Sequence, residues 1–104
     1  MISKKLTVRY LPIFSQDLKQ TLWYIKNILK NDVAAEILLI EIEKAILERS
    51  ESASCFKPYL VSDKYDYPYY RIRVKNYMIF YVVIDDVMEI RRLVHTSRDT
   101  KRYL

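Results

Sequence analysis

Three arginines and the single histidine of this 104-residue chain have the residue types that cleavage of RNA requires: Arg71, Arg73, Arg91 and His95. Attack of a 2′-hydroxyl on the neighbouring phosphate needs a base, a cation for the charge that develops on phosphorus, and an acid for the leaving oxygen. A histidine titrates near neutral pH, so His95 could serve as the base or the acid. An arginine can hold a phosphate through two parallel hydrogen bonds. These four side chains are therefore the candidate catalytic set.

Each of these residues also has an ordinary structural interpretation. A histidine at the end of a strand can bond to a backbone group, and Arg71 and Arg73 could form the solvated face of a strand. Arg91 is followed directly by Arg92. Because neighbouring strand residues point to opposite faces, at least one of these two is expected to be structural.

A second group of side chains is a candidate for binding nucleic acid or a target protein: Lys75, Arg98, Lys101, Arg102 and Tyr103. The chain has 18 Lys and Arg against 13 Asp and Glu, a net charge of +5, which favours a polyanion or an acidic protein as partner. Tyr69, Tyr77 or Tyr103 could stack on a base. Arg98, Lys101 and Arg102 could instead belong to a solvated chain end that binds nothing.

Composition argues against several other kinds of site. Cys55 and His95 are the only residues of their types, and no spacing of carboxylates suggests metal ligands, so we expect no metal and no cofactor. The chain has no glycine, which excludes glycine-rich phosphate loops. A single cysteine cannot form an internal disulfide, which is compatible with a reducing compartment.

No membrane segment or export signal is expected. The longest run of aliphatic residues, 37–40, is far shorter than the roughly 20 residues that a spanning helix needs. Residues 1–5 contain two lysines with no apolar signal core behind them. We therefore expect a cytoplasmic protein that does not contact the membrane.

The first half of the chain predicts a strand and two helices within a single domain, 1–104. Residues 6–10 alternate between apolar and polar types and end before Pro12, as a strand does. Ser15 is a candidate N-cap for a helix over residues 15–29.

Asp32 is the next candidate cap and begins a second helix, whose apolar positions follow the helical period up to Leu47. The break between the two helices is short and predicts an αα-hairpin. Trp23 and Tyr24 are expected to pack in the core and within this hairpin.

The second half predicts a long loop, residues 51–68, and then three strands: 69–74, 77–83 and 87–94. The turns between the strands are short. Because glycine is absent, Asn76 is expected to supply the positive φ of the first turn. Residues 97–104 predict a short helical turn at the end of the chain.

This order, βααβββ, predicts an α+β fold with an antiparallel-dominated sheet and the helices packed on one face. The other face is then left for function. Strict alternation places six residues on that face: Tyr69, Arg71, Arg73, Glu89, Arg91 and His95. The opposite set includes Ile72, Val74, Ile90 and Val94. Cations are therefore expected to gather on the face away from the helices.

The order of elements and the segment 70–95 resemble the RelE/ParE superfamily of toxins. Members typically show a strand bearing arginines, a turn, a strand with an apolar pair before a tyrosine, an acidic turn and a final strand running into histidine. Here these features are Arg71 and Arg73, Tyr81, the two aspartates of the turn 85–86, and His95. The resemblance covers nearly the whole chain.

The superfamily contains messenger-RNA endoribonucleases that act on the ribosome and toxins that poison DNA gyrase. The ending after His95, with Arg98 and Asp99 and a closing Arg-x-Leu, is similar to the gyrase-directed branch. In the nuclease branch a catalytic arginine commonly precedes the apolar-apolar-Tyr segment, and that position here is Met78. The resemblance therefore implies a growth-inhibiting toxin, with the gyrase-directed branch favoured.

The resemblance also implies a cognate antitoxin, whose acidic or amphipathic segment would wrap along the helical hairpin and the sheet edge. Two alternatives remain open. One is a ribosome-dependent messenger-RNA endoribonuclease that uses the candidate catalytic set. The other is a basic binding module without toxicity.

Overall fold

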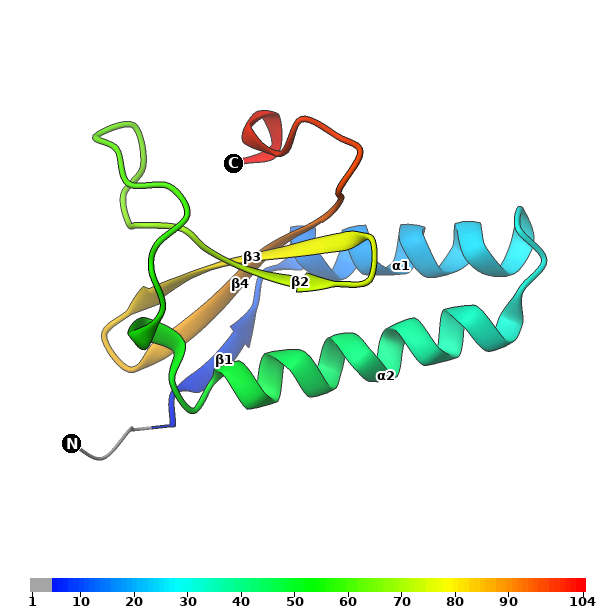
Figure 1. The fold of residues 1–104 in the computed structure, drawn as a ribbon, viewed down its shortest axis with the longest axis horizontal. Coiled ribbons are helices and arrows are strands. Elements are labelled where there is room, and N and C mark those ends of the chain that lie inside the picture. Colours follow the sequence, from blue (N-terminus) through cyan, green and yellow to red (C-terminus); the bar gives the residue numbers. More distant parts are fainter. Residues whose placement is uncertain (1–4) are drawn as a thin grey trace.

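The computed structural model describes residues 5–104 and contains the predicted elements in the predicted order (Figure 1). They are β1 (Thr7–Tyr10), α1 (Pro12–Asn27), α2 (Asp32–Arg49), a 3-10 helix (Ala53–Cys55), β2 (Tyr70–Val74), β3 (Tyr77–Ile84), β4 (Val87–His95) and a second 3-10 helix (Thr100–Tyr103). The expected lack of an export signal mostly concerns residues 1–4, which lie outside the described part.

The four strands form one sheet in the order β1-β4-β3-β2. β4 pairs in parallel with β1 and antiparallel with β3, and β3 pairs antiparallel with β2. The two helices lie antiparallel to each other and cover one face of the sheet (Figure 1). The predicted α+β fold is therefore confirmed.

The N-caps of both helices differ from the predicted ones. α1 starts at Pro12, three residues before the expected cap Ser15, with Leu11 as the N-cap. Proline is favoured in the first turn because its missing N–H would have no partner there. α2 is capped by Asn31 rather than Asp32, because the Asn31 side chain accepts a hydrogen bond from the Ala34 N–H at 3.0 Å.

Apolar side chains form two clusters, one on each face of the sheet. The larger cluster lies between helices and sheet and includes Phe14, Ile42, Ile46, Ile79 and Ile90. The second is on the other face, where residues from 59–65 and the chain end cover Phe80, Val82 and Val94. The face away from the helices is thus partly covered, whereas the sequence predicted that it would be free.

A β-bulge in β4 changes which residues share a face. Phe80 pairs with Arg92 but its neighbour Tyr81 pairs with Ile90, so Arg91 has no partner in the register. An extra residue in one strand reverses the alternation beyond it. Val94 accordingly packs in the second cluster, and His95 pairs with Tyr77, whose side chain belongs to the helix side. The predicted grouping of His95 with the strand arginines, and of Val94 with Ile90, is wrong for this reason.

The turns place positive φ on residues other than the expected one. Lys75 has φ of 52° and Asp85 has φ of 54°, each the first residue of a two-residue turn, and Lys30 between the helices has φ of 55°. Asn76 does not share this conformation among the described residues. The positive φ at the first of two turn residues is the pattern of a type II′ turn, which glycine normally occupies.

The helical hairpin carries exposed apolar side chains that the sequence placed in the core. Trp23 is 59% exposed and Tyr24 is 49% exposed. The predicted burial of both residues is wrong, because only one stripe of α1 faces the sheet, and that stripe runs through Phe14, Leu18 and Ile25. None of the helices in residues 5–104 is long and apolar enough to cross a membrane.

Candidate functional site

Arg91 is held in a network of side chains on the sheet face away from the helices. Its Nε donates to Glu89 Oε1 at 2.9 Å and its Nη1 to the Tyr69 hydroxyl at 3.1 Å. Arg9 donates to the other oxygen of the same carboxylate, with its Nε at 3.0 Å. Burial raises the pKa of Glu89, but the hydrogen bonds from Arg9 and Arg91 outweigh it and hold the pKa below its ordinary value. Arg91 is therefore engaged within the protein, where it shares the single Glu89 carboxylate with Arg9.

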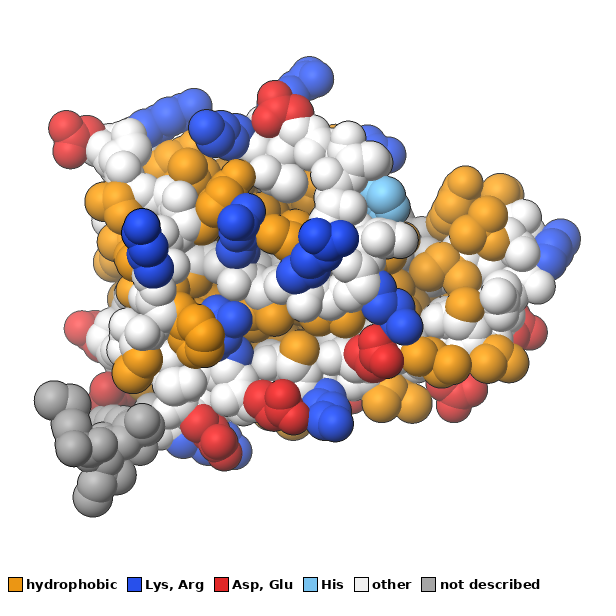
Figure 2. Space-filling model, in the orientation of Figure 1, with side chains coloured by type: hydrophobic (Ala, Val, Ile, Leu, Met, Phe, Trp, Pro, Cys, Tyr) orange, Lys and Arg blue, Asp and Glu red, His pale blue; other side chains and the backbone are white. Residues whose placement is uncertain are grey.

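Arg71 and Arg73 are exposed on β2, and neither forms an ion pair with a carboxylate of residues 5–104. The guanidinium of Arg71 lies over the Tyr59 ring, 4.1 Å from its centroid. Arg73 Nε donates to the Lys75 carbonyl at 3.0 Å. On the face that Figure 2 shows, Lys and Arg side chains are separated by apolar side chains and do not merge into one basic patch.

His95 lies away from these arginines, on the helix side of the sheet. Its Nδ1 accepts a hydrogen bond from the Ser97 N–H at 3.1 Å, and the Ser97 hydroxyl is 2.7 Å from the same nitrogen. The ring contacts Tyr77 edge-on, with the centroids 5.1 Å apart. The predicted backbone bond of a strand-end histidine is thus present, and it leaves Nε2 available.

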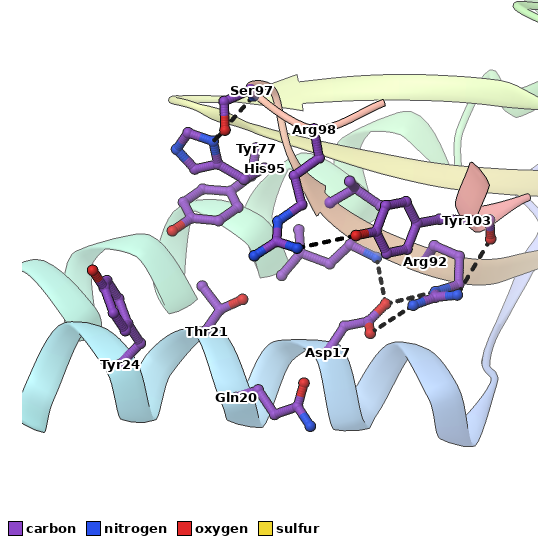
Figure 3. A pocket seen from close by; sticks show the side chains of 12 residues that line it. Asp17, Gln20, Thr21, Tyr24, Tyr77, Arg92, His95, Ser97, Arg98 and Tyr103 are labelled. Atoms are coloured by element: carbon purple, nitrogen blue, oxygen red, sulfur yellow. Dashed lines mark hydrogen bonds and ion pairs between the residues drawn. The ribbon is translucent and has the colours of Figure 1, made fainter. Parts of the chain in front are cut away.

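His95 lines a cleft of about 490 Å³ between α1, the end of β4 and the C-terminal residues (Figure 3). The polar and aromatic side chains that line it are Asp17, Gln20, Thr21, Tyr24, Tyr77, Arg92, His95, Ser97, Arg98 and Tyr103. Three segments far apart in sequence meet here. The cleft is therefore a product of the tertiary fold.

One end of the cleft is built by an ion pair between α1 and β4. Asp17 Oδ2 accepts from Arg92 Nε at 2.8 Å and from the Leu93 N–H at 3.1 Å, and Asp17 Oδ1 accepts from Arg92 Nη2 at 3.0 Å. Arg92 also donates from Nη1 to the Tyr103 carbonyl at 3.3 Å, and its guanidinium faces the Tyr103 ring. Arg92 is the structural member of the adjacent arginine pair, and it fastens the chain end to the sheet.

The other cation of the cleft, Arg98, has no such counterion. Its Nη1 donates to the Tyr103 hydroxyl at 3.0 Å, and Figure 3 shows that the guanidinium lies between α1 and the sheet. No carboxylate among residues 5–104 forms an ion pair with it. Tyr77 and Tyr24 flank the far end, and burial together with the neighbouring Tyr24 raises the pKa of Tyr77.

The structure therefore divides the candidate residues into three places. His95, Arg98 and Tyr103 line the cleft. Arg71, Arg73 and Arg91 lie on or beside the sheet face away from the helices. The remaining binding candidates are Lys101 and Arg102, exposed on the last 3-10 helix, and Lys75, whose Nζ lies 3.5 Å from Glu41 in a half-exposed pair.

Sequence reasoning missed Asp17, Tyr24 and Arg92 as parts of the cleft. A weak signal for the bulge was present, since the buried apolar positions of β4 are Met88, Ile90, Leu93 and Val94, so the alternation of two is interrupted by Arg92. Nothing in the sequence indicated that Asp17 would meet β4. Within residues 5–104 there is no cluster of three or more His, Cys, Asp or Glu that could hold a metal ion.

Comparison with known proteins gives one family and several similar structures. The sequence model described as "ParE toxin of type II toxin-antitoxin system, parDE" matches residues 8–100. A structure of the chromosomal ParDE toxin–antitoxin system from P. aeruginosa aligns with a TM-score of 0.70 at 11% identity, over 88% of this chain and 96% of that one.

Two further structures are similar at lower TM-scores. The RelB–RelE antitoxin–toxin complex from Methanococcus jannaschii aligns with a TM-score of 0.50 at 26% identity, over 92% of this chain and 99% of that one. A copper-bound mutant toxin from Helicobacter pylori aligns with a TM-score of 0.51 at 19% identity, over 88% of this chain and 96% of that one. None of the curated proteins matches.

Proposed function

Since this chain belongs to the ParE toxin family of type II toxin–antitoxin systems, we propose that it stops growth by binding DNA gyrase and not by cutting RNA. The observation that carries this choice is the separation of the candidate catalytic set. The bulge at Arg91 puts His95 on the helix side of the sheet, while Arg71 and Arg73 are on the opposite side. A proton-transfer group and a phosphate-binding fork must meet at one phosphate for RNA cleavage.

The electrostatics of the strand arginines support the same choice. Arg91 is engaged by Glu89 and Tyr69, so a phosphate would have to compete with a buried carboxylate for it. Met78, at the position where the nuclease branch commonly has an arginine, packs against the second apolar cluster. This face is suited to contact with a protein surface, with Arg71 and Arg73 as exposed charges.

We also propose that a cognate antitoxin covers the helical hairpin. Val33, Ile37 and Ile40 are 66%, 43% and 56% exposed and recur at spacings of four and three, so they form one apolar stripe along α2. Exposed apolar surface of this extent marks an interaction site, and an amphipathic helix is the partner that fits it. β2, the edge strand of the sheet, offers backbone groups for the rest of the antitoxin segment. The expected location, with gyrase as the target, is the cytoplasm.

One observation favours a second candidate function. His95, Arg98 and Tyr103 lie in the same cleft, and a histidine with a cation and a phenol could support RNA cleavage on the ribosome. In that case the catalytic residues would be those of the cleft, and Arg71, Arg73 and Arg91 would not participate directly.

Induction of this chain alone in bacteria tests the proposal, with RNA ends and DNA breaks mapped in the same culture. DNA breaks with intact messages are expected, and purified gyrase should lose supercoiling activity when the chain is added. His95→Ala and Arg73→Ala should keep part of the toxicity. New RNA ends inside translated messages, abolished by His95→Ala with the fold preserved, would establish the nuclease function instead.

A further inference from the structure

We propose that the cleft between α1 and the C-terminal residues binds a nucleotide, with Arg98 on its phosphate and the rings of Tyr24 and Tyr77 against its base. This ligand site is a property beyond the choice of target. It would be present whether the toxin acts on gyrase or on the ribosome, and it can be measured on the isolated chain.

The charges in the cleft come from Asp17, Arg92 and Arg98. Among residues 5–104, Asp17 is the only acidic side chain in the lining, and its two oxygens accept three hydrogen bonds, two from Arg92 and one from the Leu93 N–H. The Asp17 and Arg92 charges therefore balance each other. Within this described part of the chain Arg98 has no carboxylate partner, so the cleft favours an anion.

Arg98 and His95 provide hydrogen-bond donors in the cleft. One of its five N–H groups is used by Tyr103, which leaves the rest of the fork for a phosphate. His95 Nδ1 accepts from the Ser97 N–H, so Nε2 is the ring nitrogen that can donate to a ligand. The lining therefore offers several donors around a single positive charge.

Two tyrosine side chains, Tyr24 and Tyr77, line one side of the cleft. Tyr24 comes from α1 and is 49% exposed, and Tyr77 comes from β3 and is half-buried. Figure 3 shows the two rings on the same side of the cleft. Burial, and to a smaller extent the neighbouring Tyr24, raises the pKa of Tyr77. Exposed aromatic rings beside a cation are the arrangement on which unstacked bases bind. Gln20 and Thr21 on α1 supply polar groups for the edge of a base.

The size and the charge count favour a nucleotide over an acidic peptide. A volume of about 490 Å³ lies within the range of small-molecule sites. An acidic segment would need a row of cations, but the neighbouring Lys101 and Arg102 are not part of the lining. One free cation next to aromatic rings matches one phosphate next to one base.

Calorimetric titration of the purified full chain with AMP, UMP, adenosine and inorganic phosphate tests the site. We expect both nucleotides to bind with a dissociation constant below about 1 mM, and adenosine and phosphate to bind more weakly. Arg98→Ala should weaken nucleotide binding by roughly tenfold to a hundredfold, because a charge-assisted hydrogen bond is lost. Tyr24→Ala should weaken it by roughly tenfold through lost stacking.

Lys101→Ala is the matched control, since it removes one positive charge from the 3-10 helix that follows Arg98, at a position outside the lining. It should change the affinity by less than about twofold. Circular dichroism checks that each variant is folded. Three results would overturn the proposal: no nucleotide binding at millimolar concentration, phosphate binding as tightly as nucleotide, or equal losses in Arg98→Ala and Lys101→Ala. Binding of an acidic peptide in place of nucleotides would likewise assign the cleft to a protein partner.

Discussion

Replacement of Asp17 by alanine should destabilise this protein far more than replacement of an exposed carboxylate. The Asp17 and Arg92 side chains are only 13% and 19% exposed, and the carboxylate accepts three hydrogen bonds. In Asp17→Ala the Arg92 guanidinium stays largely buried without its counterion, and the Leu93 N–H loses an acceptor.

The magnitude lies between two known limits. Breaking a fully buried pair costs about 3–5 kcal/mol, and an exposed pair is worth about 0–1 kcal/mol. For Asp17 and Arg92, which are mostly but not fully buried, we expect a loss of about 2–3 kcal/mol. A small domain has about 5–15 kcal/mol of stability, so the variant should still fold, with Tm lowered by roughly 10–15 °C.

Urea unfolding followed by circular dichroism measures the loss directly. Asp63→Ala is the control, because Asp63 is an exposed carboxylate in the loop before β2, and it should change the stability by less than about 0.5 kcal/mol. A double-mutant cycle with Arg92→Leu isolates the pair. If Asp17→Ala matches the Asp63 control, or if the cycle shows no coupling, the ion pair does not hold α1 to β4 in solution and the reasoning fails.

Three further predictions concern single groups. Tyr81→Phe should lower the unfolding free energy by about 1–2 kcal/mol in urea, because the fully buried hydroxyl donates to the Ala53 carbonyl at 2.8 Å. Lys75→Gly and Asp85→Gly should each raise it by about 0.5–1 kcal/mol in thermal melts, because both residues have positive φ. Glu89 has a lowered pKa in the folded state, so its stabilisation should be present above its ordinary pKa of 4.5 and lost as pH falls through the folded value. Urea unfolding across that pH range measures how much stability is lost. In Glu89→Gln this dependence of stability on pH should be absent.

Each of these predictions has a matched control. Tyr67→Phe changes an exposed tyrosine and should leave stability unchanged, so an equal loss there would contradict the role of the Tyr81 hydroxyl. Asn76→Gly alters the same turn as Lys75 without relieving a positive φ, and an equal gain would contradict the backbone explanation. Glu36→Gln removes an exposed carboxylate, and an acid dependence that disappears equally in that variant would not originate at Glu89.

The order of elements could be predicted from the sequence because local patterns determine it. The alternation in residues 6–10, the helical spacing through Leu18, Leu22 and Ile25, and the apolar strands all agree with the structure. The N-caps are displaced from the predicted ones by four residues in α1 and by one in α2. For α1, a helix that starts at Pro12 is about as favourable as one capped by Ser15. For α2, Asn31 and Asp32 are nearly equivalent as N-caps, so the sequence alone does not decide between them.

The candidate site could not be predicted to the same extent, since it depends on one extra residue in β4. Strict alternation through Arg91 places His95 with the strand arginines, while the bulge places it with α1. Only the irregular apolar spacing of β4 indicated this. The contact between Asp17 and Arg92 joins residues 75 positions apart, and local patterns carry no information at that range.

The position of β4 in the sheet also has a consequence for biosynthesis. The last strand of the chain lies between β1 and β3, so the sheet cannot close until residues 87–95 are available. At about 5–20 residues per second the ribosome needs roughly 5–20 s to reach the end of β4, and the long-range pairing can form only after that time. A nascent chain that ends before residue 87 lacks an inner strand of the sheet. The ion pair between Asp17 and Arg92 and the cleft beside His95 therefore cannot form before β4 has been synthesised.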